Sequence, residues 1–399
     1  MERDLQHEEM IAEGRGESEA RDRTPEPCRR MASVGEIMKP GIARIAMVFV
    51  ILIAVVGLVP GRCLPGERLD FDHPGTFSIV AYDSTTGELG VAVQSKAFAV
   101  GAAVPHAEPG VGAIATQAQT NLSYGPEGIA LLGMGIPVDK VVEILTSKDE
   151  NAEVRQLGIV DAHGHAACYT GEMCTGWAGH IVGPHYAVQG NILANENVVR
   201  EMARAFERAG GTLAERLLAA LQAGQRAGGD QRGQQSAALL VVKEGFTRFV
   251  DLRVDDHETP IDELERLFRL HERGYESIMR IRSGKECLEG GFAEKAEREF
   301  EYALAIVEKY PDDAELQNNT AWALATGDVL LDDALRLAER AVELAPDKGH
   351  IWDTLGEAHF RRGELAQAIR AQEKAVELSP ETELFRERLE EWRAIARDR

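Results

Sequence analysis

Three prolines in the C-terminal part of the chain end segments that read alike, and this repetition constrains the fold more than any other feature. Pro311, Pro346 and Pro380 lie 35 and 34 residues apart and follow FEYALAIVEKY, AERAVELA and QEKAVELS. Repeats of this length are typical of stacked helix pairs, because one pair cannot bury its apolar face alone. Each proline ends a helix, since it lacks an N–H and clashes with the preceding turn. The sequence therefore predicts an all-α stack over residues 277–380.

The last unit shows the pattern most completely. It runs over residues 351–380 as IWDTLGEAHFRRGELAQAIRAQEKAVELSP and resembles the tetratricopeptide repeat family. The middle unit matches less well, because Ala321 stands where the repeat has glycine. Residues 381–399 are expected to form a polar capping helix, which such stacks need for solubility. The matching positions of the last unit are Trp352, Leu355, Gly356, Gly363, Ala368, Ala375 and Pro380.

The resemblance to tetratricopeptide repeats implies a concave surface that binds a peptide or a protein partner. A spacer role, or self-association into a homo-oligomer, is equally compatible with the repeats. A generic helical bundle is the alternative to a repeat stack over this region.

Residues 76–272 carry a different periodicity. Residues 76–82 (TFSIVAY) alternate polar and apolar side chains, as a half-buried strand does, and residues 89–93 alternate in the same way. Residues 83–87 (DSTTG) between them are turn formers, so the two segments are expected to form a hairpin. Further strands are expected over 110–117, 156–161, 165–169, 186–190, 235–243 and 247–254, and helices over 126–134, 138–146, 196–209, 212–223 and 261–273.

This order of elements favours one fold class. Strands that follow one another as hairpins pair antiparallel. Paired helices between sets of strands suit two sheets that stack face to face with helices outside, an αββα sandwich. The fold class expected is therefore α+β, followed by the all-α stack. A single-sheet α+β fold is the alternative from the pattern alone.

Residues 45–59 (IAMVFVILIAVVGLV) are apolar without interruption and follow basic residues near the N-terminus. The uncharged stretch continues to residue 61. A positive flank, an apolar centre and small residues at the end are typical of a secretory signal, and the length is at the lower limit for a spanning helix. We interpret residues 38–65 as a signal peptide or a single membrane anchor, with a buried core helix as the alternative. Residues 1–37 are then a disordered leader, explained by a start codon assigned too early, and residues 66–75 a linker or propeptide. This arrangement predicts export to the periplasm or outside the cell.

The charge balance argues against one class of partner. The chain of 399 residues carries 44 Lys+Arg against 66 Asp+Glu, a formal net charge of −22. No basic surplus is present to neutralise phosphates, so nucleic acid is not expected as a partner. At about one domain per 100–200 residues, two folded domains are expected.

The cysteines and histidines give little indication of disulfide bonds or of a metal site. Five cysteines are too few for a disulfide-built fold. Cys168 and Cys174 either pair in an oxidising compartment or remain two buried thiols. Four histidines lie between residues 163 and 185 without an HExxH or CxxC pattern, so neither a metal nor another cofactor is expected.

Several stretches of the middle region resemble one bacterial family. They are TFSIVAYDSTTGELGVAVQSKAFAVGAAVP, GVGAIATQAQTNLSYGPEG, GNILAN, LAERLLAALQAGQRAGGDQRGQQSAALLVV and VDLRVDDH, in this order within residues 76–272. These segments resemble the family called domain of unknown function 1028. That family lacks an established activity and is grouped with the N-terminal-nucleophile hydrolases. The resemblance implies an αββα sandwich. It also implies amide-bond cleavage by a Thr, Ser or Cys that becomes the first residue.

Thr76 is the residue that such chemistry would use. It follows Gly75 at the start of the first strand, and self-cleaving precursors of this superfamily often carry a Gly-Thr junction. A threonine hydroxyl needs a base near neutral pH, and its own freed α-amine, with an ordinary pKa of ~8, supplies one. Thr76 is therefore predicted to be the catalytic nucleophile, provided that a cut at Gly75–Thr76 frees its amine.

The first hairpin places a second candidate near Thr76. With the turn centred near Thr85, Gln94 faces Thr76, Ser95 is the alternative, and Lys96 lies on the same face as Gln94. A lysine ammonium there would lower the pKa of the Thr76 amine and orient the hydroxyl. A solvated lysine at a strand edge is the other interpretation of Lys96.

Polar residues in glycine-rich loops complete the predicted site. Asn191 in GNIL is a candidate catalytic oxyanion donor, and Asp230 in AGGDQRGQQS is a candidate catalytic residue that orients the others. Each also has an interpretation as loop structure, in which polar side chains satisfy the turn. The candidates for substrate binding are Gln117, Asn121, Tyr124, Arg232 and Gln235.

The sequence thus predicts an exported amide-bond hydrolase that acts on peptides or cell-wall amides in the cell envelope. The alternative is a non-catalytic envelope protein on the same fold. In that case the sandwich is a platform, and the repeats capture a partner or assemble copies of the chain.

Overall fold

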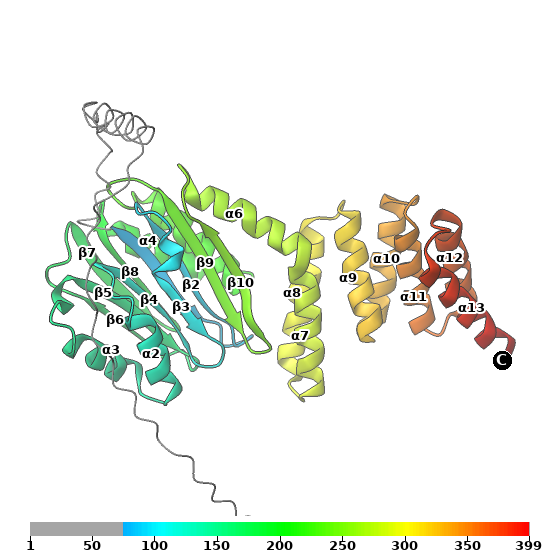
Figure 1. The fold of residues 1–399 in the computed structure, drawn as a ribbon, viewed down its shortest axis with the longest axis horizontal. Coiled ribbons are helices and arrows are strands. Elements are labelled where there is room, and N and C mark those ends of the chain that lie inside the picture. The colour runs from blue at the N-terminus through cyan, green and yellow to red at the C-terminus, as the bar shows by residue number, and fades with distance from the viewer. Residues whose placement is uncertain (1–74, 399) are drawn as a thin grey trace, which may run out of the picture. The chain divides into compact units, whose positions relative to one another are not determined.

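The structure is a computed structural model that describes residues 75–398 (Figure 1). Its first part contains two antiparallel sheets. The six-stranded sheet comprises β1 (Thr76–Tyr82), β2 (Leu89–Ser95), β7 (Trp177–Gly183), β8 (Tyr186–Leu193), β9 (Ser236–Lys243) and β10 (Phe246–Val254), in the order β10–β9–β2–β1–β8–β7. The four-stranded sheet comprises β3 (Pro105–Glu108), β4 (Gly112–Ala118), β5 (Arg155–Asp161) and β6 (Ala166–Thr170), in sequence order. β1 is therefore an interior strand of the larger sheet.

Helices cover the outer face of each sheet, and the inner faces pack on each other. The helices are α2 (Tyr124–Gly133), α3 (Val138–Ser147), α4 (Asn197–Arg208), α5 (Leu213–Arg226) and α6 (Pro260–His271), with short 3-10 turns η1 (Val100–Ala102) and η2 (Ala152–Val154). α2 and α3 contact the four-stranded sheet, whereas α4, α5 and α6 contact the six-stranded sheet. The layers run α–β–β–α, as the order of elements predicts, and the single-sheet alternative is wrong.

β1 shows how the strand sequence builds these layers. Its side chains alternate between the two faces of the sheet. Phe77 and Ile79 enter the apolar core beneath the helices, and Val80 enters the core between the sheets. Ser78 also points between the sheets, where its hydroxyl donates to Gln117 of β4 at 2.6 Å. Thr76 lies two residues before Ser78 and shares this inner face.

Two strands and one helix junction differ from the sequence prediction. The pattern did not predict β3, which has four residues and begins with proline, or β7 (WAGHIVG), whose glycines and exposed positions mask the alternation. The helix expected to end at Arg273 instead continues through a π turn, η3 (Glu272–Glu276), into the next helix. Gly274 does not break this helix, and the flanking Glu272 and Glu276 are both buried.

The second part of the chain is a stack of helices. They are α7 (Ser277–Glu289), α8 (Ala293–Lys309), α9 (Ala314–Gly327), α10 (Leu331–Leu344), α11 (Gly349–Arg361), α12 (Leu365–Leu378) and α13 (Glu383–Asp398). They pack as successive pairs, with α13 against α12. A Cβ on Gly356 would lie 3.1 Å from both Gln372 and Trp392, so the glycine lets α11 approach its neighbours closely. Trp392 of α13 stacks on Phe360, with ring centroids 4.9 Å apart.

Five buried charged side chains join the first helix pair to the sandwich. We call Glu88, Lys243, Glu276, Arg280 and Glu299 the ion cluster. The Arg280 guanidinium lies 2.9 Å from Glu88, 2.8 Å from Glu276 and 3.2 Å from Glu299. The Lys243 ammonium lies 3.4 Å from Glu88 and also pairs with Glu299. Glu88 precedes β2 and Lys243 ends β9, so the cluster fastens α7 and α8 to one end of these strands.

Most of the predicted N-terminal segments lie outside the described residues. These are the leader over 1–37, the signal or anchor over 38–65, and all of the 66–75 linker except Gly75. Within residues 75–398, no helix is long and apolar enough to cross a membrane.

Candidate functional site

Thr76 begins an interior strand and is bordered by polar residues on both sides. In the ladder it lies opposite Ser95 of β2 and Asn191 of β8. Only 2% of Thr76 is exposed, and its hydroxyl donates to the Ser95 hydroxyl at 3.1 Å. The expected pairing with Gln94 is wrong by one residue, and the alternative, Ser95, is the observed partner. A shift of one residue moves Gln94 and Lys96 to the other face of the strand.

The carbonyl oxygen of Gly75 is bound by two side chains next to the Thr76 hydroxyl. The Ser95 hydroxyl donates to this oxygen at 2.5 Å, and the Arg232 guanidinium donates at 3.0 Å. We call Ser95 and Arg232 the carbonyl cradle. A hydroxyl and a cation directed at one carbonyl oxygen polarise it and stabilise negative charge that develops there.

Asp230 fixes the cationic half of the carbonyl cradle. Its carboxylate accepts from Arg232 Nη2 at 2.7 Å and from Arg232 Nε at 3.1 Å, a two-point contact that sets the plane of the guanidinium. It also accepts from the backbone N–H of Lys96 at 3.2 Å. Asp230 is buried, so this pairing holds Arg232 against Gly75 with little freedom.

A chain of buried amide and hydroxyl groups lies between the sheets beneath Thr76. We call Ser78, Gln117, Gln156, Gln189 and Asn191 the amide seam. Gln117 Nε2 donates to the Thr76 carbonyl at 3.3 Å and to Gln156 Oε1 at 2.8 Å. Asn191 Nδ2 donates to the same Gln156 oxygen at 3.0 Å, and Gln189 Nε2 donates to Ser78 at 2.7 Å. These mutual bonds satisfy groups that would be costly to bury unpaired.

A hollow of about 150 Å³ opens beside Asn191. Two of its residues, Ala118 and Ile192, have positive φ values of 67° and 51°. This conformation is an outlier for a β-branched residue such as isoleucine, and strain of this kind is often kept at functional sites. The other lining residues are Gln119, Val154, Met173, Cys174 and Thr175.

The structure brings together four of the predicted site residues and places Gln117 directly beneath them. Thr76, Asn191, Asp230 and Arg232 lie at one end of the six-stranded sheet. Lys96 contributes its backbone N–H to Asp230, but its exposed ammonium donates to the Gln234 carbonyl at 3.2 Å. The predicted effect of Lys96 on the Thr76 amine stays a prediction.

Three predicted substrate-binding residues form contacts elsewhere. Asn121 and Tyr124 donate to Asp149 at 2.9 and 3.1 Å. Burial alone would raise the pKa of Asp149, but bonds from Arg155 and Asn121 hold it well below its usual range. Gln235 donates to Asp256 at 3.1 Å. These contacts match the alternative interpretation, in which polar side chains order their own loops.

Two further expectations from the sequence concern the cysteines and a metal ion. Cys168 and Cys174 are both free thiols, and burial raises the pKa of each. Protonated thiols are poor nucleophiles. Within residues 75–398, no group of three or more His, Cys, Asp or Glu side chains could hold a metal ion.

Sequence reasoning missed most of the amide seam. Ser78, Gln156 and Gln189 were not candidates, although all three are polar residues within largely apolar strand sequences. An amide flanked by buried strand residues must find a partner across the sheets. That rule could have marked Gln156 and Gln189 from the sequence.

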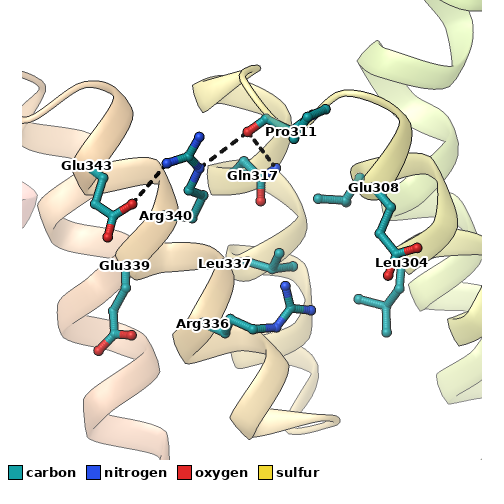
Figure 2. A pocket seen from close by; sticks show the side chains of 10 residues that line it. Leu304, Glu308, Pro311, Gln317, Arg336, Leu337, Glu339, Arg340 and Glu343 are labelled. Atoms are coloured by element: carbon teal, nitrogen blue, oxygen red, sulfur yellow. Dashed lines mark hydrogen bonds and ion pairs between the residues drawn. The ribbon is translucent and has the colours of Figure 1, made fainter.

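The helical stack has a larger hollow of its own, of about 470 Å³, between α8, α9 and α10 (Figure 2). Its Arg340 donates to the Pro311 carbonyl at 3.4 Å and to Glu343 at 3.0 Å. Arg336 pairs with Asp333 at 2.8 Å. These cations are engaged with neighbouring groups, so the hollow resembles a helix junction more than a built anion site.

Comparison with known proteins finds a match in each part of the chain. Residues 76–264 match the family described as a family of unknown function, DUF1028, and residues 349–382 match a tetratricopeptide repeat. A search of curated proteins gives no match.

Among solved structures, a DUF1028 protein from Silicibacter pomeroyi is 33% identical, over 50% of this chain and 91% of that one, with a TM-score of 0.48. MamA from Desulfovibrio magneticus RS-1 is 20% identical over 32% of this chain and 88% of its own, with a TM-score of 0.22. The first tetratricopeptide domain of Spaghetti (RPAP3), solved with an HSP90 peptide, is 20% identical over 30% and 94%, with a TM-score of 0.24. The sequence identity of 33% over 91% of the Silicibacter protein shows that the chain belongs to the DUF1028 family. The chain also carries a tetratricopeptide repeat behind that domain.

Proposed function

We propose that this protein is an amide-bond hydrolase that uses Thr76 as an N-terminal nucleophile after cleavage of its own Gly75–Thr76 bond. One observation carries the proposal: the Gly75 carbonyl is bound by Ser95 and Arg232 directly beside the Thr76 hydroxyl. The resemblance to N-terminal-nucleophile hydrolases adds the reaction type. The predicted signal or anchor at residues 45–61 suggests that the reaction takes place outside the cytosol.

The bonds around Gly75 suggest the course of self-cleavage. Thr76 Oγ forms a bond to the Gly75 carbonyl carbon, and the π electron pair of the carbonyl moves onto its oxygen. The Thr76 proton passes to Ser95, and the Ser95 proton passes to that oxygen, along the hydrogen bonds that already connect them. Arg232 stabilises the charge on the oxygen during the transfer.

The second half of the reaction frees the amine. As the Gly75–Thr76 C–N bond breaks, the proton on the carbonyl oxygen moves to the nitrogen and leaves an ester on Thr76. Water then hydrolyses the ester and releases the upstream chain. The free Thr76 amine, with an ordinary pKa of ~8, is the base for the next amide, and Asp230 keeps Arg232 in place. Asn191, beside the hollow, is the predicted second donor to the substrate.

The helical stack has a separate role in this proposal. A tetratricopeptide repeat behind the catalytic domain fits a protein partner, and the partner would deliver a substrate or localise the enzyme. The alternative function is binding without catalysis. It is favoured by the burial of Thr76, of which only 2% is exposed.

Intact-mass measurement and N-terminal sequencing of the protein from an exporting host test the proposal. We expect a wild-type chain that begins at Thr76. Thr76→Ser should still cleave, because a hydroxyl remains, whereas Thr76→Ala should remain uncut and show no amide hydrolysis. Thr85→Ala, the same substitution in the exposed turn after β1, is the matched control and should cleave normally. A Thr76→Ala chain that begins at residue 76 would rule out this mechanism, and a wild-type chain that retains Gly75 would favour the binding function.

A further inference from the structure

The space around the α-carbon of Gly75 excludes a side chain. A Cβ added to Gly75 would lie 2.7 Å from Asp230 Oδ2, 2.8 Å from Ile192 Cβ and 3.0 Å from Arg232 Nη2. Nonbonded carbon atoms do not approach heavy atoms this closely without displacement. Any residue larger than glycine would therefore have to move both Ile192 and the Asp230–Arg232 pair.

Neither neighbour can move aside easily. Asp230 is buried and bonded to two nitrogens of Arg232 and to the backbone N–H of Lys96. The contact from Ile192 comes from Cβ, which is attached directly to the backbone. That backbone is held on both sides, because its N–H donates to Thr175 at 3.0 Å and its carbonyl accepts from Gln231 at 3.0 Å.

The same walls would surround an external substrate. The nucleophile and the carbonyl cradle are fixed, so an amide attacked by Thr76 must place its carbonyl oxygen against Ser95 and Arg232. Its α-carbon then occupies the position that Gly75 occupies in the uncut chain. We propose, building on the hydrolase function above, that the substrates are glycyl amides, whose acyl residue carries no side chain on the carbon next to the scissile carbonyl.

Two fluorogenic amides test this assignment directly. The self-cleaved wild-type chain is given acetylglycyl-7-amido-4-methylcoumarin and its acetyl-L-alanyl counterpart, which differ by one methyl group. Overpacking a tight site costs about 1–3 kcal/mol, so kcat/KM should favour the glycyl amide by about 5- to 150-fold. Equal or faster turnover of the alanyl amide overturns the assignment, as does a self-cleaved chain that hydrolyses neither. A chain that never self-cleaves overturns the hydrolase function instead.

Two substitutions of Ile192 test whether its Cβ excludes a side chain from the substrate. Ile192→Gly removes the Cβ that lies 2.8 Å from the added atom, whereas Ile192→Ala keeps that Cβ and loses the rest of the side chain. The ratio of alanyl to glycyl turnover should therefore rise in Ile192→Gly and stay near the wild-type value in Ile192→Ala. The same ratio in all three proteins would contradict the assignment.

Self-cleavage gives a readout that needs no added substrate. Gly75→Ala in the full chain should slow the appearance of the Thr76 N-terminus by at least about 5-fold, since the new Cβ meets the same neighbouring atoms. Adding Ile192→Gly to this variant should restore part of the rate. A Gly75→Ala chain that cleaves as fast as wild type would show that the walls do not select against a side chain.

Discussion

The two ends of strand β2 are built from opposite chemistry. At its last residue, Ser95 belongs to a site of mostly neutral groups, where hydroxyls and amides bond one another and a single ion pair, Asp230–Arg232, is directed at one carbonyl. Just before its first residue, Glu88 is buried with four other charged side chains in the ion cluster. The same strand therefore carries directed hydrogen bonds at one end and concentrated charge at the other.

The difference shows what each end is suited to do. Hydrogen bonds have preferred directions, so the neutral end can hold one peptide bond in one orientation. The charges of a buried cluster compensate one another, and losing one member leaves other charges without compensation. The Glu88 end is thus suited to fastening the helical stack, and the Thr76 end to chemistry. Three measurements probe this contrast.

Removal of the central cation should have the largest effect. Arg280→Met leaves Glu88, Glu276 and Glu299 buried with only Lys243 to balance them, and breaking such a pairing costs about 3–5 kcal/mol. Arg282→Met is the matched control, because Arg282 pairs with Glu286 at the surface and an exposed pair contributes about 0.3–0.5 kcal/mol. Urea unfolding followed by circular dichroism measures both. Similar losses in the two variants would show that the ion cluster does not fasten the junction.

The pH dependence of stability should come from the same end of the strand. Burial, helped by Glu272 and Glu88 and opposed by Arg280, raises the pKa of Glu276 to about 7. Its Oε2 is buried without a hydrogen-bond partner among the described residues. The folded state therefore holds this proton more tightly than the unfolded chain does. The stability that this proton contributes is present below the unfolded pKa and is lost as the pH rises through about 7.

Glu276→Gln isolates this contribution, because glutamine resembles the protonated acid. The variant and the wild type should have similar free energies of unfolding near pH 5. Near pH 8 the variant should be more stable, by up to about 3 kcal/mol. Parallel stability curves for the two proteins between pH 5 and pH 8 would contradict the raised pKa.

The amide seam should give a smaller effect with no pH dependence. Gln156 joins Gln117 and Asn191 and also donates to the Gly190 carbonyl at 2.9 Å. Gln156→Leu leaves these groups unpaired, at a cost of about 1–3 kcal/mol. Gln119→Leu, at an exposed position near the end of β4, should cost far less. Equal costs in urea unfolding at neutral pH would mean that the seam is satisfied without Gln156.

The sequence predicted the parts of the fold that depend on local periodicity. Residues 76–82 and 89–93 alternate clearly, and β1 and β2 begin where the alternation begins. The sequence pattern did not predict β3 and β7, because a four-residue strand and a glycine-rich strand depend on their neighbours for pairing. The pattern did not predict the continuous helix after Arg273 either, since the ion cluster that supports it joins residues nearly 200 positions apart in the sequence.

Members of the candidate site were named from the sequence where one residue type is required, and others were missed where partners come from distant strands. Thr76 follows from the Gly-Thr junction, and Asp230 and Arg232 from a glycine-rich loop. A register error of one residue placed Gln94 rather than Ser95 opposite Thr76, and this error also assigned Lys96 to the wrong face. Periodicity gives the face of a side chain only when the register of the turn is known.

The interior position of β1 has a consequence for a chain that begins at Thr76. Chain termini usually fray, because few contacts restrain the first residues. Here the new first residue would lie in a strand with a neighbour on each side, β2 and β8, so its backbone would be held from the outset. A terminal amine so anchored has little conformational entropy left to lose when it enters a reaction. This chain would obtain the positioning from the sheet itself, because β1 pairs with β2 and β8.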